Sequence, residues 1–225
     1  MNVLAIESSS KKCGIALHSN NSVHESFDEI ENDSATSLPI MTEKILTTLS
    51  LEFSDLDAIA ISIGPGSFTG LRVGLSYAKG LSLALDIPLI PISTFDLLLI
   101  PNIKDIKDDL ISVLIHSHGT TVYHSRYISK NKTYVLENDP SSIALNDISQ
   151  ENNGTIMYYG PKHLLDSINT LSSKIHIVIP SVSDVIDIGM KNFDLLKTKS
   201  INNLVPNYIG SFNTCLLYTS PSPRD

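Results

Sequence analysis

The chain has 225 residues, 42% of them hydrophobic, and a formal net charge of -8 at pH 7. This length and composition suffice for one large core or two modest ones. The negative charge argues against an independent grip on nucleic acid, because that affinity comes largely from Lys and Arg neutralising phosphates.

The cellular compartment is predicted from segments that the sequence lacks. No apolar run approaches the roughly 20 residues that a helix needs to span a bilayer. The first residues read directly as a strand, without the basic and then apolar order of a signal peptide. Two cysteines, Cys13 and Cys215, give no disulfide framework. We therefore expect a cytoplasmic chain with no membrane contact.

Strand and helix patterns alternate in the first hundred residues. Three short strands joined by polar turns are predicted at residues 3–7, 14–18 and 23–27. A helix follows, and its inner face carries Leu38, Met41, Ile45 and Leu49. The next strand, 57–63, alternates large and small apolar side chains, as a strand buried on both faces does.

A glycine-rich loop joins that strand to a second helix. The segment Ile63–Gly74 reads IGPGSFTGLRVG, in which Gly64 and Gly66 can turn the chain and Ser67 or Thr69 can cap the helix. It is not a nucleotide loop of the Walker type, because Leu71 stands where that motif has lysine. The glycine spacing also departs from the dinucleotide fingerprint.

The helix after this loop has an unusual face. Gly70, Gly74 and Ala78 form a ridge spaced by four residues, beside which lie Tyr77, Leu81 and Leu85. Arg72 and Lys79 lie on the opposite face. Glycine within a helix costs up to about 1 kcal/mol relative to alanine, so we expect something to press closely on this ridge. A second protein and the chain's own sheet both fit that role.

Three segments together resemble one known family. They are Met1–Ser10, Gly64–Gly74 and Pro88–Thr94, and with them the chain is similar to the TsaB (YeaZ) family. That family is a bacterial subunit of the machinery that makes threonylcarbamoyladenosine beside the anticodon of tRNA. The likeness is strong to about residue 100 and thin afterwards, where Pro206–Ile209 resembles the family's Pro-x-Tyr-Leu ending.

The resemblance implies an α/β fold of the actin, sugar kinase and Hsp70 type, which is ribonuclease H-like. Two subdomains are expected, each with a mixed sheet flanked by helices. Residues 1–105 would form the N-terminal subdomain with the glycine loop and the interface helix, and 106–214 a smaller C-terminal one. Residues 215–225 look like a translated sequencing adaptor or a disordered tail, and we exclude them from the predicted fold.

In the second subdomain, the residue pattern itself predicts further elements. Strands are expected at 110–115, 121–127 and 175–179, and helices at 162–171 and 182–196.

The resemblance also implies the partners. TsaB proteins act beside TsaD, the catalytic homologue, with the ATPase TsaE in the same complex, and tRNA is reached only through that complex. A homodimer through the same face is a competing assembly. The expected interface residues are Gly66, Ser67, Phe68, Thr69, Gly70, Gly74, Tyr77, Ala78 and Leu81.

No catalytic residue is expected. ATP-using enzymes of this fold resemble one another in two acid-containing phosphate hairpins. The first hairpin would be a vestigial nucleotide site made of Glu7, Ser8, Ser9, Ser10 and Lys11. In the second, residues 115–121, His116 replaces the aspartate, which removes a hard oxygen ligand for magnesium. We expect an accessory subunit with no cofactor beyond weak nucleotide binding.

Two enzyme classes remain as alternatives. One is a small-molecule kinase of the same fold, and the other is a metallopeptidase-like relative of TsaD. His116, His118 and His124 could meet across a strand pair, a trio that zinc would accept. No Cys or carboxylate lies at ligand spacing, and no two of the seven histidines are four apart as in the His-x-x-x-His pair of TsaD. We therefore predict no metal site.

Overall fold

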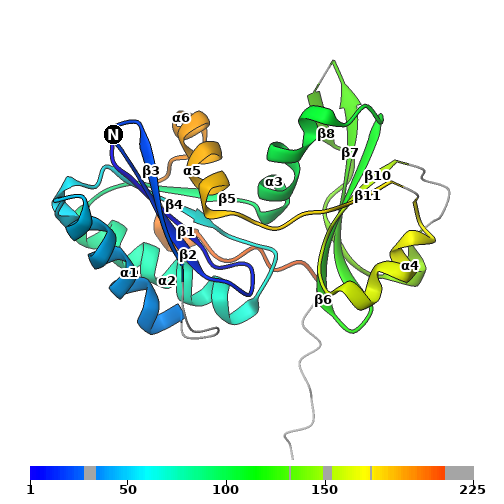
Figure 1. The fold of residues 1–225 in the computed structure, drawn as a ribbon, viewed down its shortest axis with the longest axis horizontal. Helices are drawn as coiled ribbons and strands as arrows, with labels where there is room; N and C mark the ends of the chain where they lie inside the picture. Colours follow the sequence, from blue (N-terminus) through cyan, green and yellow to red (C-terminus); the bar gives the residue numbers. More distant parts are fainter. Residues whose placement is uncertain (28–33, 132, 149–153, 173, 211–225) are drawn as a thin grey trace, which may run out of the picture.

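The structure is a computed structural model that describes residues 1–27, 34–131, 133–148, 154–172 and 174–210. The chain forms two lobes, each built on one β-sheet with helices against it (Figure 1). This architecture is the one that the family resemblance predicts. The segment 215–225, with Cys215, lies outside the described residues.

The first lobe contains a five-stranded sheet in the order β3-β2-β1-β4-β5. Its central strand β1 pairs antiparallel with β2 and parallel with β4. Every residue of β1 and of β4 is buried, which explains why both strands read as continuous apolar runs. The strands are Val3–Glu7 (β1), Gly14–Ser19 (β2), Ser22–Phe27 (β3), Ala58–Ser62 (β4) and Leu89–Ile92 (β5).

Helices cover both faces of this sheet. On one face lie α1 (Ser34–Thr48) and α2 (Phe68–Leu85), packed on a core that includes Leu4, Ile15 and Ile59. On the other face lies α5 (Val182–Lys191), packed on Val3, Ala60 and neighbouring residues. Figure 1 shows these two helical layers on opposite sides of the sheet. The sides of α1 and α2 that point away from the sheet therefore form one outer face of the first lobe.

The second lobe contains a six-stranded sheet, in the order β11-β10-β6-β7-β8 with β9 paired to β7. Its faces are covered by α3 (Thr94–Leu99) and by α4 (Leu165–Asn169). The strands are Leu110–His118 (β6), Thr121–Lys130 (β7), Thr133–Leu136 (β8), Ser141–Ala144 (β9), Thr155–Tyr159 (β10) and Ile175–Ile177 (β11). The sequence pattern predicted β6, β7 and β11, but missed α3, β8, β9 and β10.

Two helices are exchanged between the lobes. α3 follows the last strand of the first sheet, yet Phe95, Leu98 and Leu99 pack on the second sheet. α5 comes from the segment 106–214, yet it packs on β1, β2, β4 and β5 of the first sheet. A cut between residues 105 and 106 would therefore separate each of these helices from the sheet it covers.

Two predicted helices are shorter or interrupted. The segment 162–171 begins as a 3-10 turn at Lys162–Leu164 and continues as α4. The segment 182–196 divides at Asn192 into α5 and α6 (Phe193–Leu196). Within the described residues, no helix combines the length and hydropathy that crossing a membrane requires.

Candidate functional site

The first hairpin turn is organised around the carboxylate of Glu7 at the end of β1. Glu7 is 2% exposed. One oxygen accepts hydrogen bonds from the Ser9 amide at 2.9 Å, the Ser9 hydroxyl at 2.6 Å and the Ser10 amide at 3.0 Å. The other accepts from the Ser62 hydroxyl on β4 at 3.0 Å. The carboxylate thus ties the turn to the neighbouring strand.

Burial dominates the electrostatics of this carboxylate. It raises the pKa of Glu7, and the hydrogen bonds from Ser9, Ser62 and Ser10 oppose that rise. A magnesium ligand needs a carboxylate oxygen that can face the ion, whereas both Glu7 oxygens face their own turn and strand. The geometry therefore suits an internal anchor better than a metal ligand.

The glycines of the loop and of α2 lie directly on this turn. A Cβ added at Gly66 would overlap the Ser9 carbonyl oxygen, and one at Gly70 would overlap that of Ser8. At Gly74 an added Cβ would overlap the Ser8 hydroxyl. The Ser67 amide donates to the Ser9 carbonyl at 2.8 Å, which fixes the start of the helix against the turn. Close packing inside the chain explains why these positions are glycine.

This packing corrects the predicted interface ridge. Gly74 and Ala78 are buried within the monomer, and Gly70 is half-buried against Ser8. The Gly70, Gly74 and Ala78 ridge therefore faces the chain's own sheet, so a partner cannot pack on it. The physical reason is the approach of α2 to Ser8, which leaves no volume for a side chain at Gly70 or Gly74, while Ala78 is buried in the core of the lobe.

The remaining predicted interface residues lie at the edge of this contact. Ser67, Phe68 and Thr69 are exposed at the start of α2. Tyr77 and Leu81 are half-buried and pack beside the core beneath α1 and α2. These residues can border a partner surface, but they do not form a continuous one.

The outward side of α2 has a second ridge of small residues that the sequence analysis missed. Ser76, Gly80 and Ala84 are spaced by four, and all three are exposed. A Cβ at Gly80 would meet no atom within 4 Å, so internal packing does not explain this glycine. Leu83 beside it is 69% exposed, and Ile40 on α1 is 59% exposed. The sequence contains a signal for this outward side, because Arg72 and Lys79 lie on it and charged side chains usually face water.

An aromatic and cationic cluster lies at the start of the same helix. The Arg72 guanidinium carbon is 3.7 Å from the centroid of the Phe68 ring, and Arg72 Nε donates to the Tyr208 hydroxyl at 2.7 Å. The rings of Phe68 and Tyr208 are 5.4 Å apart between centroids. The Pro206–Ile209 segment is thereby held against the start of α2, beside a cleft of about 470 Å³ between the lobes.

The second hairpin does not supply what a magnesium-nucleotide complex needs. The His116 Nε2 atom is 3.2 Å from the Gly119 carbonyl oxygen of its own turn. The amide of exposed Lys11 donates to the Tyr159 hydroxyl at 3.4 Å, so a second-lobe side chain contacts the first hairpin turn. With Glu7 engaged internally and an imidazole in the place of a carboxylate, these residues do not fit that group.

The three histidines considered for zinc have separate surroundings. His118 contacts Ser117, and a β-bulge lies between His116 and His118. His124 lies 3.4 Å from the Ser112 hydroxyl, and burial beside Arg126 lowers its pKa to about 4. In the part of the chain that the structure describes, no three His, Cys, Asp or Glu side chains gather as a metal site.

Comparison with known proteins places the chain in a family. A family model described as TsaD, tRNA N6-adenosine threonylcarbamoyltransferase, matches residues 24–156, more than half of the chain. The chain is 28% identical to the tRNA threonylcarbamoyladenosine biosynthesis protein TsaB of Buchnera aphidicola subsp. Acyrthosiphon pisum, over 89% of this chain and 91% of that protein. It is 33% identical to the Bacillus subtilis protein of the same name, over 58% of this chain and 57% of that protein.

A solved structure shows the same fold. YeaZ from Pseudomonas aeruginosa superposes with a TM-score of 0.77 at 19% identity, covering 92% of this chain and 99% of that one. The superposition includes both lobes, while the sequence matches extend well beyond the glycine loop. This chain belongs to the TsaB (YeaZ) family, within the wider group that the TsaD family model describes.

Proposed function

We propose that this chain is an accessory subunit in the biosynthesis of threonylcarbamoyladenosine on tRNA, and that it acts by binding TsaD. The observation that carries the proposal is the similarity to a TsaB protein along 91% of that relative's length. A role in this pathway accounts for the net charge of -8, because tRNA would be gripped by the partner. Such a subunit works in the cytoplasm, where tRNA is modified.

The proposed mechanism is organisational, with no catalytic residue on this chain. Two observations support it: the Glu7 carboxylate is engaged by Ser9, Ser10 and Ser62, and His116 stands where an ATP-using hairpin has aspartate. A subunit of this kind needs no cofactor of its own. It would raise the activity of TsaD by stabilising the conformation that transfers the threonylcarbamoyl group.

We assign the contact with TsaD to the outer face of α1 and α2. This surface, called the α1–α2 face below, is defined by Ile40, Ser76, Gly80, Leu83 and Ala84, all of them exposed. The small residues let a partner helix approach closely, while Ile40 and Leu83 supply apolar area. TsaE would join the resulting complex, and a homodimer through this face would compete with TsaD.

The test is binding of purified TsaD from the same organism to a Gly80→Arg variant. Gly80 faces open space, so the arginine can be accommodated in the folded chain but blocks the approach of a partner helix. We expect the dissociation constant to rise by about 100-fold or more, measured by calorimetry. The matched control is Ser167→Arg, an exposed position on α4 of the second lobe, which should bind as the unchanged chain does.

Two outcomes would contradict the assignment. Equal affinity of the Gly80→Arg variant and the unchanged chain would remove TsaD from the α1–α2 face. The second contradicting outcome would come from native mass spectrometry of the unchanged chain mixed with TsaD. If the chain remained homodimeric and formed no mixed complex, TsaD would not be its partner.

A further inference from the structure

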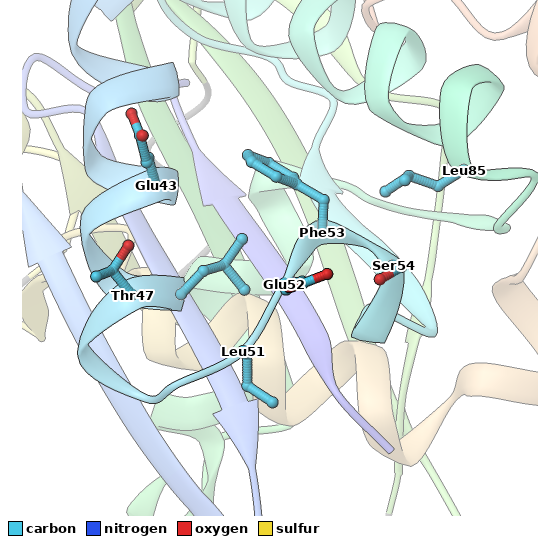
Figure 2. Close-up of a pocket in the computed structure, with 8 residues that line it drawn as sticks. Glu43, Thr47, Leu51, Glu52, Phe53, Ser54 and Leu85 are labelled. Atoms are coloured by element: carbon cyan, nitrogen blue, oxygen red, sulfur yellow. The ribbon is translucent and has the colours of Figure 1, made fainter.

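A pocket opens at the end of the α1–α2 layer, where α1 and α2 meet the connection to β4. It has a volume of about 530 Å³. Figure 2 shows Phe53 between α1, which carries Glu43 and Thr47, and Leu85 at the end of α2. The pocket is lined by Glu43, Leu46, Thr47, Leu51, Glu52, Phe53, Ser54 and Leu85.

The walls and the rim of this pocket differ in chemistry. Leu46 is buried and forms part of the apolar wall, with Leu51, Phe53 and Leu85 only partly covered. Phe53 is 37% exposed, so apolar surface remains open to water at this pocket. An apolar chain entering the pocket would cover these surfaces and gain free energy by leaving water.

Two carboxylates, those of Glu43 and Glu52, lie on the exposed rim. Four salt bridges occur within the described ranges, and none includes Glu43 or Glu52. Lys44 neighbours Glu43 along α1 but forms no ion pair with it there. The two negative charges therefore lie over an apolar pocket, and no cation among the described residues forms an ion pair with either of them.

Apolar walls under an anionic rim fit a long side chain with a cationic end. Arginine suits the pocket better than lysine, because its planar guanidinium can stack on the Phe53 ring while it donates to carboxylates. Its aliphatic stem would lie along the leucine side chains. A free small anion is disfavoured by the rim charge.

The position of the pocket indicates where such an arginine comes from. Glu43 lies one helical turn after Ile40 on the exposed side of α1, whereas Leu85 lies on the inner side of α2 with Tyr77 and Leu81 and forms the inner wall of the pocket. The rim of the pocket on α1 thus adjoins the surface assigned to TsaD. A partner lying on that face would bring its own side chains to the pocket's opening.

We propose that this pocket receives one arginine side chain of the partner subunit that covers the α1–α2 face. The inference rests on the proposed function, since it names a recognition element of the same interface. This pocket, called the arginine socket below, would add charge complementarity to a face that otherwise offers small and apolar residues. It would also fix the lateral position of the partner helix.

The experiment compares two double variants that change the net charge equally. Glu43→Gln with Glu52→Gln removes the rim charges and keeps the shape of the pocket. Asp139→Asn with Asp166→Asn removes two exposed charges from the second lobe. Calorimetric titration with TsaD at about 50 and 300 mM salt should show about tenfold weaker binding of the first variant at low salt, with a smaller salt dependence. The second variant should bind as the unchanged chain does.

A third variant tests the aromatic wall. Phe53→Leu keeps an apolar side chain but removes the ring, and we expect about threefold weaker binding from the loss of cation–π stacking. Circular dichroism and thermal unfolding of every variant, matched to the unchanged chain, establish that the fold is retained. If the Phe53→Leu variant binds TsaD as tightly as the unchanged chain does, the proposed stacking of an arginine on the Phe53 ring is refuted.

The outcomes separate this inference from the proposed function. If the Glu43 and Glu52 variant binds TsaD normally while Gly80→Arg prevents binding, the interface stands and the arginine socket is refuted. If both double variants weaken binding equally, net charge is the cause and the socket is again refuted. If Gly80→Arg also binds normally, the proposed interface falls, and the socket with it.

Discussion

The two sides of α2 carry the same kind of residues under opposite constraints. The inner side places Gly70 and Gly74 against Ser8, where no side-chain volume is left, and buries Ala78 in the core. The outer side places Ser76, Gly80 and Ala84 in water, and a Cβ at Gly80 would touch nothing. On α2, small residues spaced by four are thus closely packed on the inner side and lie on an open surface on the outer side. Substitutions that are disruptive inside should be tolerated outside.

The largest effect is expected at Gly74 on the inner side. In Gly74→Leu the new side chain must displace Ser8 and the turn that Glu7 holds. Overpacking a core costs about 1 to 3 kcal/mol, and the proximity of the Ser8 turn places this variant at about 3 kcal/mol or above. Urea unfolding monitored by circular dichroism measures the loss. A Gly74→Leu variant as stable as the unchanged chain would show that the inner side is not closely packed.

Removing the anchor beneath the inner side should have the next largest effect. The Ser62 hydroxyl is buried and donates to Glu7 at 3.0 Å. Removing one partner of a buried hydrogen bond costs about 1 to 3 kcal/mol, so Ser62→Ala should lower the free energy of unfolding by about 2 kcal/mol. The control is Ser76→Ala on the outer side, which should change it by less than about 0.5 kcal/mol. Equal effects at both serines would contradict the comparison.

The same anchor should make stability depend on pH. Because burial raises the pKa of Glu7, the folded chain binds its proton more tightly than the unfolded chain does. Above the ordinary value of 4.5, stability therefore falls as pH rises, until the folded group also ionises. The slope from one such group is at most about 1.4 kcal/mol per pH unit.

Glu7→Gln isolates this contribution, since glutamine cannot ionise. The unchanged chain should lose stability relative to the variant as pH is raised from about 4.5 to neutrality, as urea unfolding at several pH values would measure. A constant difference between the two proteins across that range would mean that the Glu7 carboxyl titrates alike in the folded and unfolded chains.

The sequence predicted the frame of the first lobe because its signals are local. β1 and β4 are apolar on both faces, and the glycine loop with Ser67 as cap marks the start of α2. The missed strand Thr155–Tyr159 is a run of five residues with two tyrosines, too short for periodicity to separate strand from helix. The exchange of α3 and α5 between sheets depends on contacts distant in sequence, which no local pattern encodes.

For the candidate site, periodicity established which residues share a side of α2, but not what each side faces. Two ridges of small residues exist on this helix, and the sequence analysis considered only the one beginning at Gly70. The charges of Arg72 and Lys79 distinguish the ridges, since charged side chains rarely face a core. The Glu7 anchor was harder to predict, because its partner Ser62 lies 55 residues away on a neighbouring strand.

The smallest effect, and the one opposite in sign, is expected at Gly80. Gly80→Ala adds a methyl group in open space and removes the conformational freedom of glycine from the unfolded chain, so we expect a gain of about 0.5 to 1 kcal/mol. The matched control is Gly189→Ala on α5, where the new Cβ would lie 3.2 Å from the Ala60 Cβ and the crowding offsets the gain. A stabilised Gly80→Ala chain that binds TsaD more weakly would show that this glycine is retained for the interface at a cost in monomer stability. A gain in stability with no loss of binding would leave the outer glycine unexplained by contact with TsaD.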